Sequence, residues 1–200
     1  MLERINKYWA TKSIWSKLSD FIFIGLVIVL LFPQGRMAVG GFVNNIKAQV
    51  INPSKLSEEI VVSAENFNWS LKDSKGNIVN LQNYKGKVLF INLWATWCPP
   101  CVGEMPEIQE LYDTFKSNED IAFLMISNEK VPKINHFVES KDYSFPVFSS
   151  QIEAPTVFGT NSIPTTFVVS KSGKMVIKEI GAANWGGEKM QKLVRDLLEE

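Results

Sequence analysis

The chain has 200 residues, of which 46% are hydrophobic and 12% aromatic, enough for one domain with a sizeable core and for additional segments. Its formal net charge is zero, and residues 44–200 carry slightly more acidic than basic side chains, which excludes the basic surface of a nucleic-acid-binding protein. Residues 1–43 instead carry five Lys/Arg against two Asp/Glu. The two parts are therefore expected to occupy different environments.

The N-terminal part combines a basic leader with an apolar run. Residues 21–32 are uninterrupted apolar residues, preceded by Arg4, Lys7, Lys12 and Lys17. This pattern predicts a cytoplasmic leader over 1–20 and a transmembrane anchor or a cleaved signal segment over 21–43. A twelve-residue helix is only about 18 Å long, typical of a signal peptide, whereas residues 37–43 could lengthen the run into an anchor. Both alternatives place the rest of the chain outside the cytoplasm, either tethered on the periplasmic side or released there.

Polar residues with scattered aliphatics follow over 44–66, and they predict a stalk that could contain a little local strand or helix. A hairpin is expected over 67–81, because its hydrophobic stretches flank a turn containing Gly76 and Asn77. Residues 88–94 are nearly all apolar, as in a strand that is covered on both faces. They are expected to form the central strand.

The second half of the chain alternates between helical and strand patterns. Apolar residues spaced three and four apart over 105–115 predict an amphipathic helix, and residues 121–127 predict a second buried strand, parallel to the first. The remaining expected elements are a helix over 131–141, a short strand and turn over 144–149 and 154–159, a hairpin of 165–170 with 175–180, and a closing helix over 188–198.

Cys98 and Cys101 lie two residues apart, where the central strand gives way to the helix. Unpaired N–H groups in the first turn of a helix stabilise a thiolate, so Cys98 is the predicted nucleophile. Pro99 and Pro100 suit that first turn, because their φ is helical and the donors they lack would be unpaired. Cys101, one turn further in, is the predicted resolving thiol of a disulfide exchange reaction.

Two other interpretations of the pair are an inert structural disulfide and half of a metal site. Structural zinc takes about four ligands, yet the chain has two cysteines and one histidine, His136, which is expected on a solvated helix face. Val102 follows Cys101, which excludes haem attachment through a C-x-x-C-H motif. No metal and no external cofactor are therefore predicted, because the cysteine pair itself is the redox group.

Three stretches together carry a family resemblance: residues 92–101 (NLWATWCPPC), Glu104 with Pro106, and residues 162–167 (SIPTTF). Residues 67–200 resemble a thioredoxin-fold domain and are most similar to the membrane-tethered TlpA/ResA-like thiol:disulfide oxidoreductases. The resemblance implies an α/β, thioredoxin-like fold in which a mixed central sheet is flanked by helices.

The resemblance also implies roles for individual residues. The Ile163-Pro164 bond would be cis and lie against the disulfide, where the Ile163 backbone pairs with an extended substrate strand; the alternative is a proline tolerated at the start of a strand. Trp97 would shield the sulfurs, unless it is a core aromatic. Asn92 replaces a buried Asp of thioredoxin and cannot titrate, whereas Glu104 would exchange a proton with the resolving thiol, unless it is a solvated surface residue.

The leading functional hypothesis is a membrane-tethered enzyme that reduces disulfides in exported proteins, for example during cytochrome c maturation. A thiol protein in the membrane would resupply its electrons. Two alternatives remain open: an oxidant of the same fold that installs disulfides, and a module that carries copper(I) on the two sulfurs. A peroxide-reducing enzyme of related fold would need a lone cysteine in a different local pattern, which the chain lacks.

Overall fold

The computed structural model describes residues 13–32, 52–58 and 60–200, which belong to two compact units, Met1–Gly40 and Gly41–Glu200. In the first unit, helix α2 (Ile14–Leu31) begins after Ser13, whose side-chain oxygen accepts a hydrogen bond from the Ser16 backbone N–H. No helix within the described residues combines the length and the apolarity needed to cross a membrane. The basic leader up to residue 12 and the extension over 37–43 lie outside the described residues, so the anchor or signal segment stays a prediction.

The start of the second unit corrects the expected stalk over 44–66. Strand β1 (Ile60–Val61) pairs with strand β8 (Lys174–Ile180), so that Ile60 faces Met175. The backbone N–H of Leu56 donates to the carbonyl oxygen of Val176 at 2.8 Å. These backbone groups find their partners in the sheet rather than in water, which makes this stretch part of the domain. Residues 44–51 of the expected stalk lie outside the described residues.

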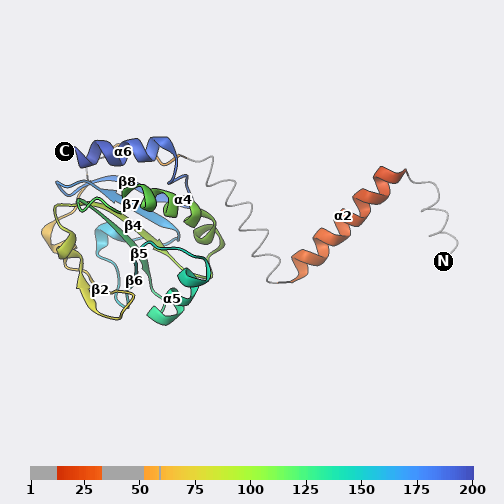
Figure 1. The fold of residues 1–200 in the computed structure, drawn as a ribbon, viewed down its shortest axis with the longest axis horizontal. Coiled ribbons are helices and arrows are strands. Elements are labelled where there is room, and N and C mark those ends of the chain that lie inside the picture. Colours follow the sequence, from red (N-terminus) through yellow and green to blue (C-terminus); the bar gives the residue numbers. More distant parts are fainter. Residues whose placement is uncertain (1–12, 33–51, 59) are drawn as a thin grey trace. The chain divides into compact units, whose positions relative to one another are not determined.

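The described residues form one mixed sheet of eight strands in the order β1-β8-β7-β4-β5-β6-β2-β3 (Figure 1). Strand β4 is parallel to β5 and antiparallel to β7, and it occupies the middle of the sheet as predicted. The strands not yet given are β2 (Ser70–Lys72), β3 (Ile78–Asn80), β4 (Val88–Trp94), β5 (Ile121–Ser127), β6 (Val147–Ser149) and β7 (Thr165–Val169). The mixed α/β fold predicted from the resemblance is confirmed.

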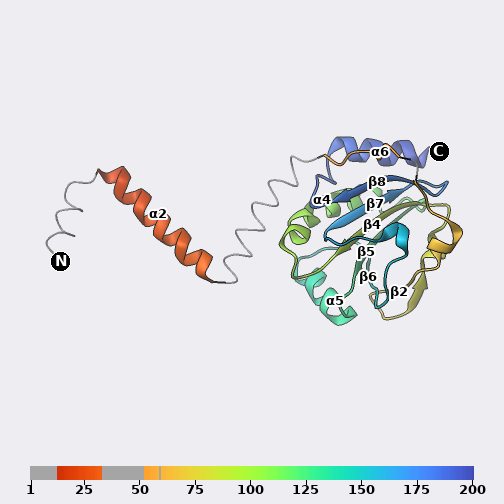
Figure 2. The ribbon, with the colours of Figure 1, turned by 180° about the vertical axis from the view of Figure 1, so that it is seen from behind.

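Side chains alternate along β4 and thereby supply two separate cores. Phe90 and Trp94 join a cluster with buried residues of helices α4 (Pro99–Phe115), α5 (Val131–Ser140) and α6 (Glu188–Leu198). Leu89 and Ile91 join a second cluster with the β2–β3 hairpin and the short helix η3 (Thr156–Phe158). Figure 1 and Figure 2 show these elements from opposite sides of the sheet. The expected bounds of β4, β5 and α6 are confirmed residue for residue.

The second core predicts unequal effects of two substitutions in one hairpin. Leu71 on β2 is 1% exposed, whereas Ile78 on β3 is 75% exposed. We expect Leu71→Ala to lower the free energy of unfolding by about 2–5 kcal/mol, because it leaves a cavity. Ile78→Ala should change it by less than about 0.5 kcal/mol. Urea unfolding of the full chain measures both; equal losses would contradict the assignment of the hairpin to the core.

Candidate active site

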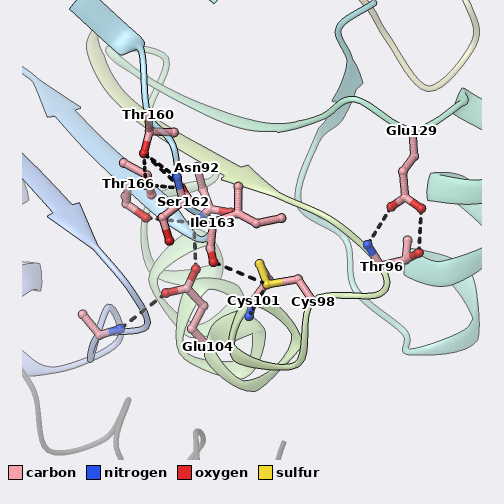
Figure 3. Close-up of a disulfide and its surroundings, with 12 residues drawn as sticks. Asn92, Thr96, Cys98, Cys101, Glu104, Glu129, Thr160, Ser162, Ile163 and Thr166 are labelled. Atoms are coloured by element: carbon pink, nitrogen blue, oxygen red, sulfur yellow. Dashed lines mark hydrogen bonds between the residues drawn. A yellow bond between two sulfur atoms is a disulfide. The ribbon is translucent and has the colours of Figure 1, made fainter. Parts of the chain in front are cut away.

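The two cysteines form a disulfide at the start of α4, with Cα atoms 5.3 Å apart (Figure 3). Cys98 is the N-cap residue, and its carbonyl oxygen accepts the first intrahelical hydrogen bond, from the Val102 N–H. Its sulfur accepts a hydrogen bond from the backbone N–H of Cys101 at 3.3 Å. The end of β4 and the first turn of α4 therefore place this sulfur where a helix terminus stabilises negative charge.

The loop that precedes β7 lies against the disulfide. The Ile163-Pro164 peptide bond is cis, as the resemblance implies, and the carbonyl oxygen of Ile163 lies 3.7 Å from the Cys98 sulfur. The loop is held by hydroxyls, because Thr165 donates to the Ser162 carbonyl oxygen at 2.7 Å and Thr160 donates to it at 3.0 Å. Ile163 is thus presented beside the reactive sulfur by a fixed backbone.

Glu104 lies one turn beyond Cys101 on α4 and is fully buried, at 0% exposure. The alternative of a solvated surface residue is therefore wrong. Its carboxylate accepts hydrogen bonds from Asn92 Nδ2 and Trp185 Nε1, both at 2.8 Å, and from the backbone N–H of Ala183 at 3.4 Å. Burial raises the pKa of Glu104 to about 8, and these three hydrogen bonds limit the rise.

Asn92 is buried on β4 and links Glu104 to β7, because its Nδ2 also donates to Thr166 Oγ1 at 2.8 Å. Its own Oδ1 has no hydrogen-bond partner within the part of the chain that the structure describes. A half turn of the side-chain amide would let Oδ1 accept the proton of a neutral Glu104 carboxyl and the hydroxyl proton of Thr166. The surroundings of Glu104 therefore suit a protonated carboxyl as well as a charged one.

Glu129 fixes the turn that leads into Cys98. Its carboxylate accepts hydrogen bonds from the backbone N–H of Thr96 at 2.6 Å and from the Thr96 hydroxyl at 3.0 Å (Figure 3), and it forms an ion pair with Lys133. Burial acts to raise the pKa of Glu129, but the hydrogen bonds from Lys133 and Thr96 outweigh it and leave the pKa below its ordinary value. The Glu129 carboxylate thus fixes the position of Thr96, which lies two residues before the predicted nucleophile Cys98.

Two of these residues, Glu129 and Trp185, are not among those predicted from the sequence. Glu129 had a usable signal, because it closely follows a strand that runs parallel to the one before Cys98, and such strands end at one edge of a sheet. Trp185 had none, because nothing in the sequence around it pairs it with Glu104.

The other residues singled out in the sequence lie at the start of α4 or on the protein surface. Trp97 is 59% exposed, so it is not a core aromatic, and its role as a shield stays a prediction. Pro99 and Pro100 open α4 as expected, and His136 lies on the exposed side of α5. Among the described residues, no group of three or more His, Cys, Asp or Glu side chains is arranged to hold a metal ion.

The chain matches the AhpC/TSA family model over residues 62–178. It is 35% identical over 127 residues to a thiol-disulfide oxidoreductase ResA of Bacillus cereus, a match that covers 62% of this chain and 72% of the relative. It is 31% identical over 121 residues to the thiol-disulfide oxidoreductase ResA of Bacillus subtilis, covering 60% and 67%.

The fold also matches a crystal structure of a thiol:disulfide interchange protein of the thioredoxin family from Chlorobium tepidum TLS. That match has a TM-score of 0.52 and 23% identity, and it covers 74% of this chain and 97% of the other. The redox group is the chain's own Cys98–Cys101 pair, and this enzyme class acts on proteins that contain disulfides. The chain belongs to the AhpC/TSA family and is a thioredoxin-like thiol-disulfide oxidoreductase.

Proposed function

We propose that this oxidoreductase reduces disulfides of exported proteins outside the cytoplasm, with Cys98 as the nucleophile and Cys101 as the resolving thiol. The proposal rests on one hydrogen bond at the N-terminus of α4. The backbone N–H of Cys101 donates it to the Cys98 sulfur, with 3.3 Å between nitrogen and sulfur. That donor favours the thiolate of Cys98 over the thiolate of Cys101. A natural class of substrate is the haem-attachment cysteines of c-type cytochromes during their maturation.

The exchange proceeds in two steps with a balanced flow of electrons and protons. The Cys98 thiolate attacks one sulfur of the substrate disulfide, so that a mixed disulfide forms and the other substrate sulfur leaves as a thiolate, which takes up a proton. Cys101 then loses its proton and attacks the Cys98 sulfur, which releases the second substrate thiol. Two electrons and two protons pass to the substrate, and a thiol protein in the membrane returns them to the oxidised pair.

Glu104 is the proposed partner for the proton of Cys101. The two residues are three positions apart on α4, and such residues are neighbours on one helix face. With its pKa raised to about 8 by burial, the carboxyl titrates close to neutral pH and can both accept and return a proton. Asn92 and Trp185 hold the carboxyl in place in either state.

Reduction rather than oxidation is favoured by the two prolines that open α4. Pro99 and Pro100 occupy positions whose backbone N–H groups could otherwise face the sulfur, and proline has no such donor. The Cys98 thiolate is therefore less stabilised than one with a full set of donors. A strongly stabilised dithiol form makes an oxidant, so weaker stabilisation favours a reductant.

Export is supported by the sequence of the first 43 residues, in which a basic leader precedes an apolar run. The run would serve either as a membrane anchor or as a cleaved signal. It is also consistent with export that the chain has no cysteine besides the redox pair, because spare thiols can form wrong disulfides in an oxidising compartment.

Substitution of each cysteine separates their roles. Cys98→Ser should abolish turnover of a disulfide substrate, whereas Cys101→Ser should accumulate mixed disulfides on Cys98, because the second attack is lost. Non-reducing electrophoresis with mass spectrometry of the full chain expressed in its own cells identifies the captured proteins. Capture through Cys101 would reverse the two roles, and a catch made up of cytoplasmic proteins would contradict the proposed location.

The reduction potential of the Cys98/Cys101 couple decides the direction of electron flow. We expect a value nearer to that of thioredoxin, about −270 mV, than to that of protein disulfide isomerase, about −180 mV. Equilibration of the purified protein with glutathione or dithiothreitol buffers, followed by alkylation of free thiols, measures it. A value at or above about −180 mV would favour the disulfide-forming alternative.

Glu104→Gln should change the pH dependence of both stability and activity. Since the pKa of Glu104 rises from 4.5 to about 8 on folding, the folded chain binds this proton more tightly, and the associated stability is lost as pH rises from about 4.5 through about 8. The Tm of the wild type should therefore fall as pH rises over this range, and the Tm of the variant should fall much less. Its disulfide exchange should be slower by about ten- to a hundredfold and flatter with pH.

A matched control for this experiment is Glu139→Gln, the same change at an exposed position of helix α5. It should leave both pH profiles as they are in the wild type. If Glu104→Gln also left them unchanged, Glu104 would have no role in proton transfer.

A further inference from the structure

A cavity of about 430 Å³ opens next to the disulfide, at the edge of the sheet where β4 and β5 end. Its apolar lining comes from the ends of β4 and β5, the segment after β6 and the loop before β7; it includes Leu93, Trp94, Ile126, Ile152 and Ile163. Ile163 belongs to both sites, because its carbonyl oxygen also lies 3.7 Å from the Cys98 sulfur. The cavity therefore begins where the cysteine of a substrate must approach.

The outer wall of the cavity is held in place by a chain of hydrogen bonds. Trp69 Nε1 donates to Ser150 Oγ at 3.0 Å, and the Ser150 hydroxyl donates to the carbonyl oxygen of Ile152 at 2.8 Å. Gln151 adds a bond from Nε2 to the carbonyl oxygen of Asn128 at 3.2 Å. As a result, Ile152 is held at the surface with its side chain 58% exposed, instead of being folded into the core.

Some of the exposed large hydrophobic side chains lie near this cavity. Among the described residues of the second unit, the side chains of this kind are Val61, Ile78, Trp97, Ile152 and Ile180. Trp97 directly precedes Cys98, Ile152 lines the cavity, and Ile180 pairs with Thr165, the residue after Pro164. Three of the five are therefore linked to the redox pair, to the cavity or to the strand that follows Pro164. Among the described residues that line the cavity, Glu153 is the one ionisable side chain, so the lining has no cation to pair with an acidic side chain.

We infer that this cavity is a specificity subsite, which binds an aliphatic or aromatic side chain of the substrate protein close to the cysteine that Cys98 attacks. The inference rests on the proposed disulfide reduction. An extended chain advances about 3.3–3.6 Å per residue, and Ile163 touches both the sulfur and the cavity, so the bound side chain belongs to a residue one or two positions from that cysteine. A volume of about 430 Å³ accommodates a leucine or a phenylalanine side chain.

Disulfide-linked peptide dimers test this subsite with the reduced full-length chain. The peptides share one sequence except at a single position, which carries either leucine or serine. This position lies one or two residues before or after the cysteine, so four positions are tested in turn. We expect kcat/KM to be about tenfold or more higher for leucine than for serine at one of these positions, as is typical of one apolar group in a hydrophobic pocket. Ile152→Ser should reduce this ratio to about two or less.

The control variant is Ile78→Ser, which alters a still more exposed isoleucine on β3, outside the cavity. It should keep the wild-type ratio. Equal rates for leucine and serine at all four positions, or an unchanged ratio in Ile152→Ser, would overturn the subsite. Glutathione disulfide, which has no leucine beside its cysteine, tests disulfide reduction separately from the subsite. If the wild type reduces neither glutathione disulfide nor any peptide, the proposed reduction fails and the subsite fails with it.

Discussion

The chemistry of this protein depends on how three neighbouring strands end at one edge of the sheet. Strand β4 leads into Cys98, the parallel strand β5 ends beside it and leads to Glu129, and the antiparallel strand β7 begins there after Pro164. Hydrogen bonds between these strands fix the relative positions of the three loops, since a shift of register would move every side chain to the opposite face. The three loops are therefore held in fixed positions by the sheet, although they have no regular structure of their own.

The first turns of α4 carry out two opposite electrostatic tasks. The N-terminal turn directs a backbone donor at the Cys98 sulfur, whereas the next turn buries Glu104 against Trp185 and Asn92. Burying a carboxylate is costly, and hydrogen bonds offset only part of that cost, so the pKa rises to about 8. Near neutral pH the carboxyl therefore exchanges between a neutral form, which does not oppose a negative charge nearby, and a charged form, which can accept a proton.

Much of this arrangement could be predicted from the sequence, because strong local patterns determined it. The apolar runs of β4 and β5 have no plausible position except between covered faces, and the two cysteines and prolines fit a strand-to-helix junction. The buried position of Glu104 could not be predicted from local patterns, because it depends on Trp185 and Ala183, which are about 80 residues away in the chain.

The failure at the expected stalk has a similar cause. Residues 44–66 taken together are polar enough to resemble a linker, yet a strand of two residues, Ile60 and Val61, is sufficient to extend the sheet when its partner β8 is already in place. The position of Glu129 could have been anticipated from the parallel strands. Its bond to the Thr96 N–H could not, because it depends on the conformation of a turn.

The outer strands of the sheet have a consequence for the protein's behaviour in solution. The two edges are formed by β1 and β3, which are only two and three residues long. Short edges offer few unpaired backbone groups to the strands of other chains, which limits self-association through the sheet. The pairing of an extended substrate with the Ile163 backbone, which the family resemblance implies, would therefore have little competition from the outer strands of the sheet.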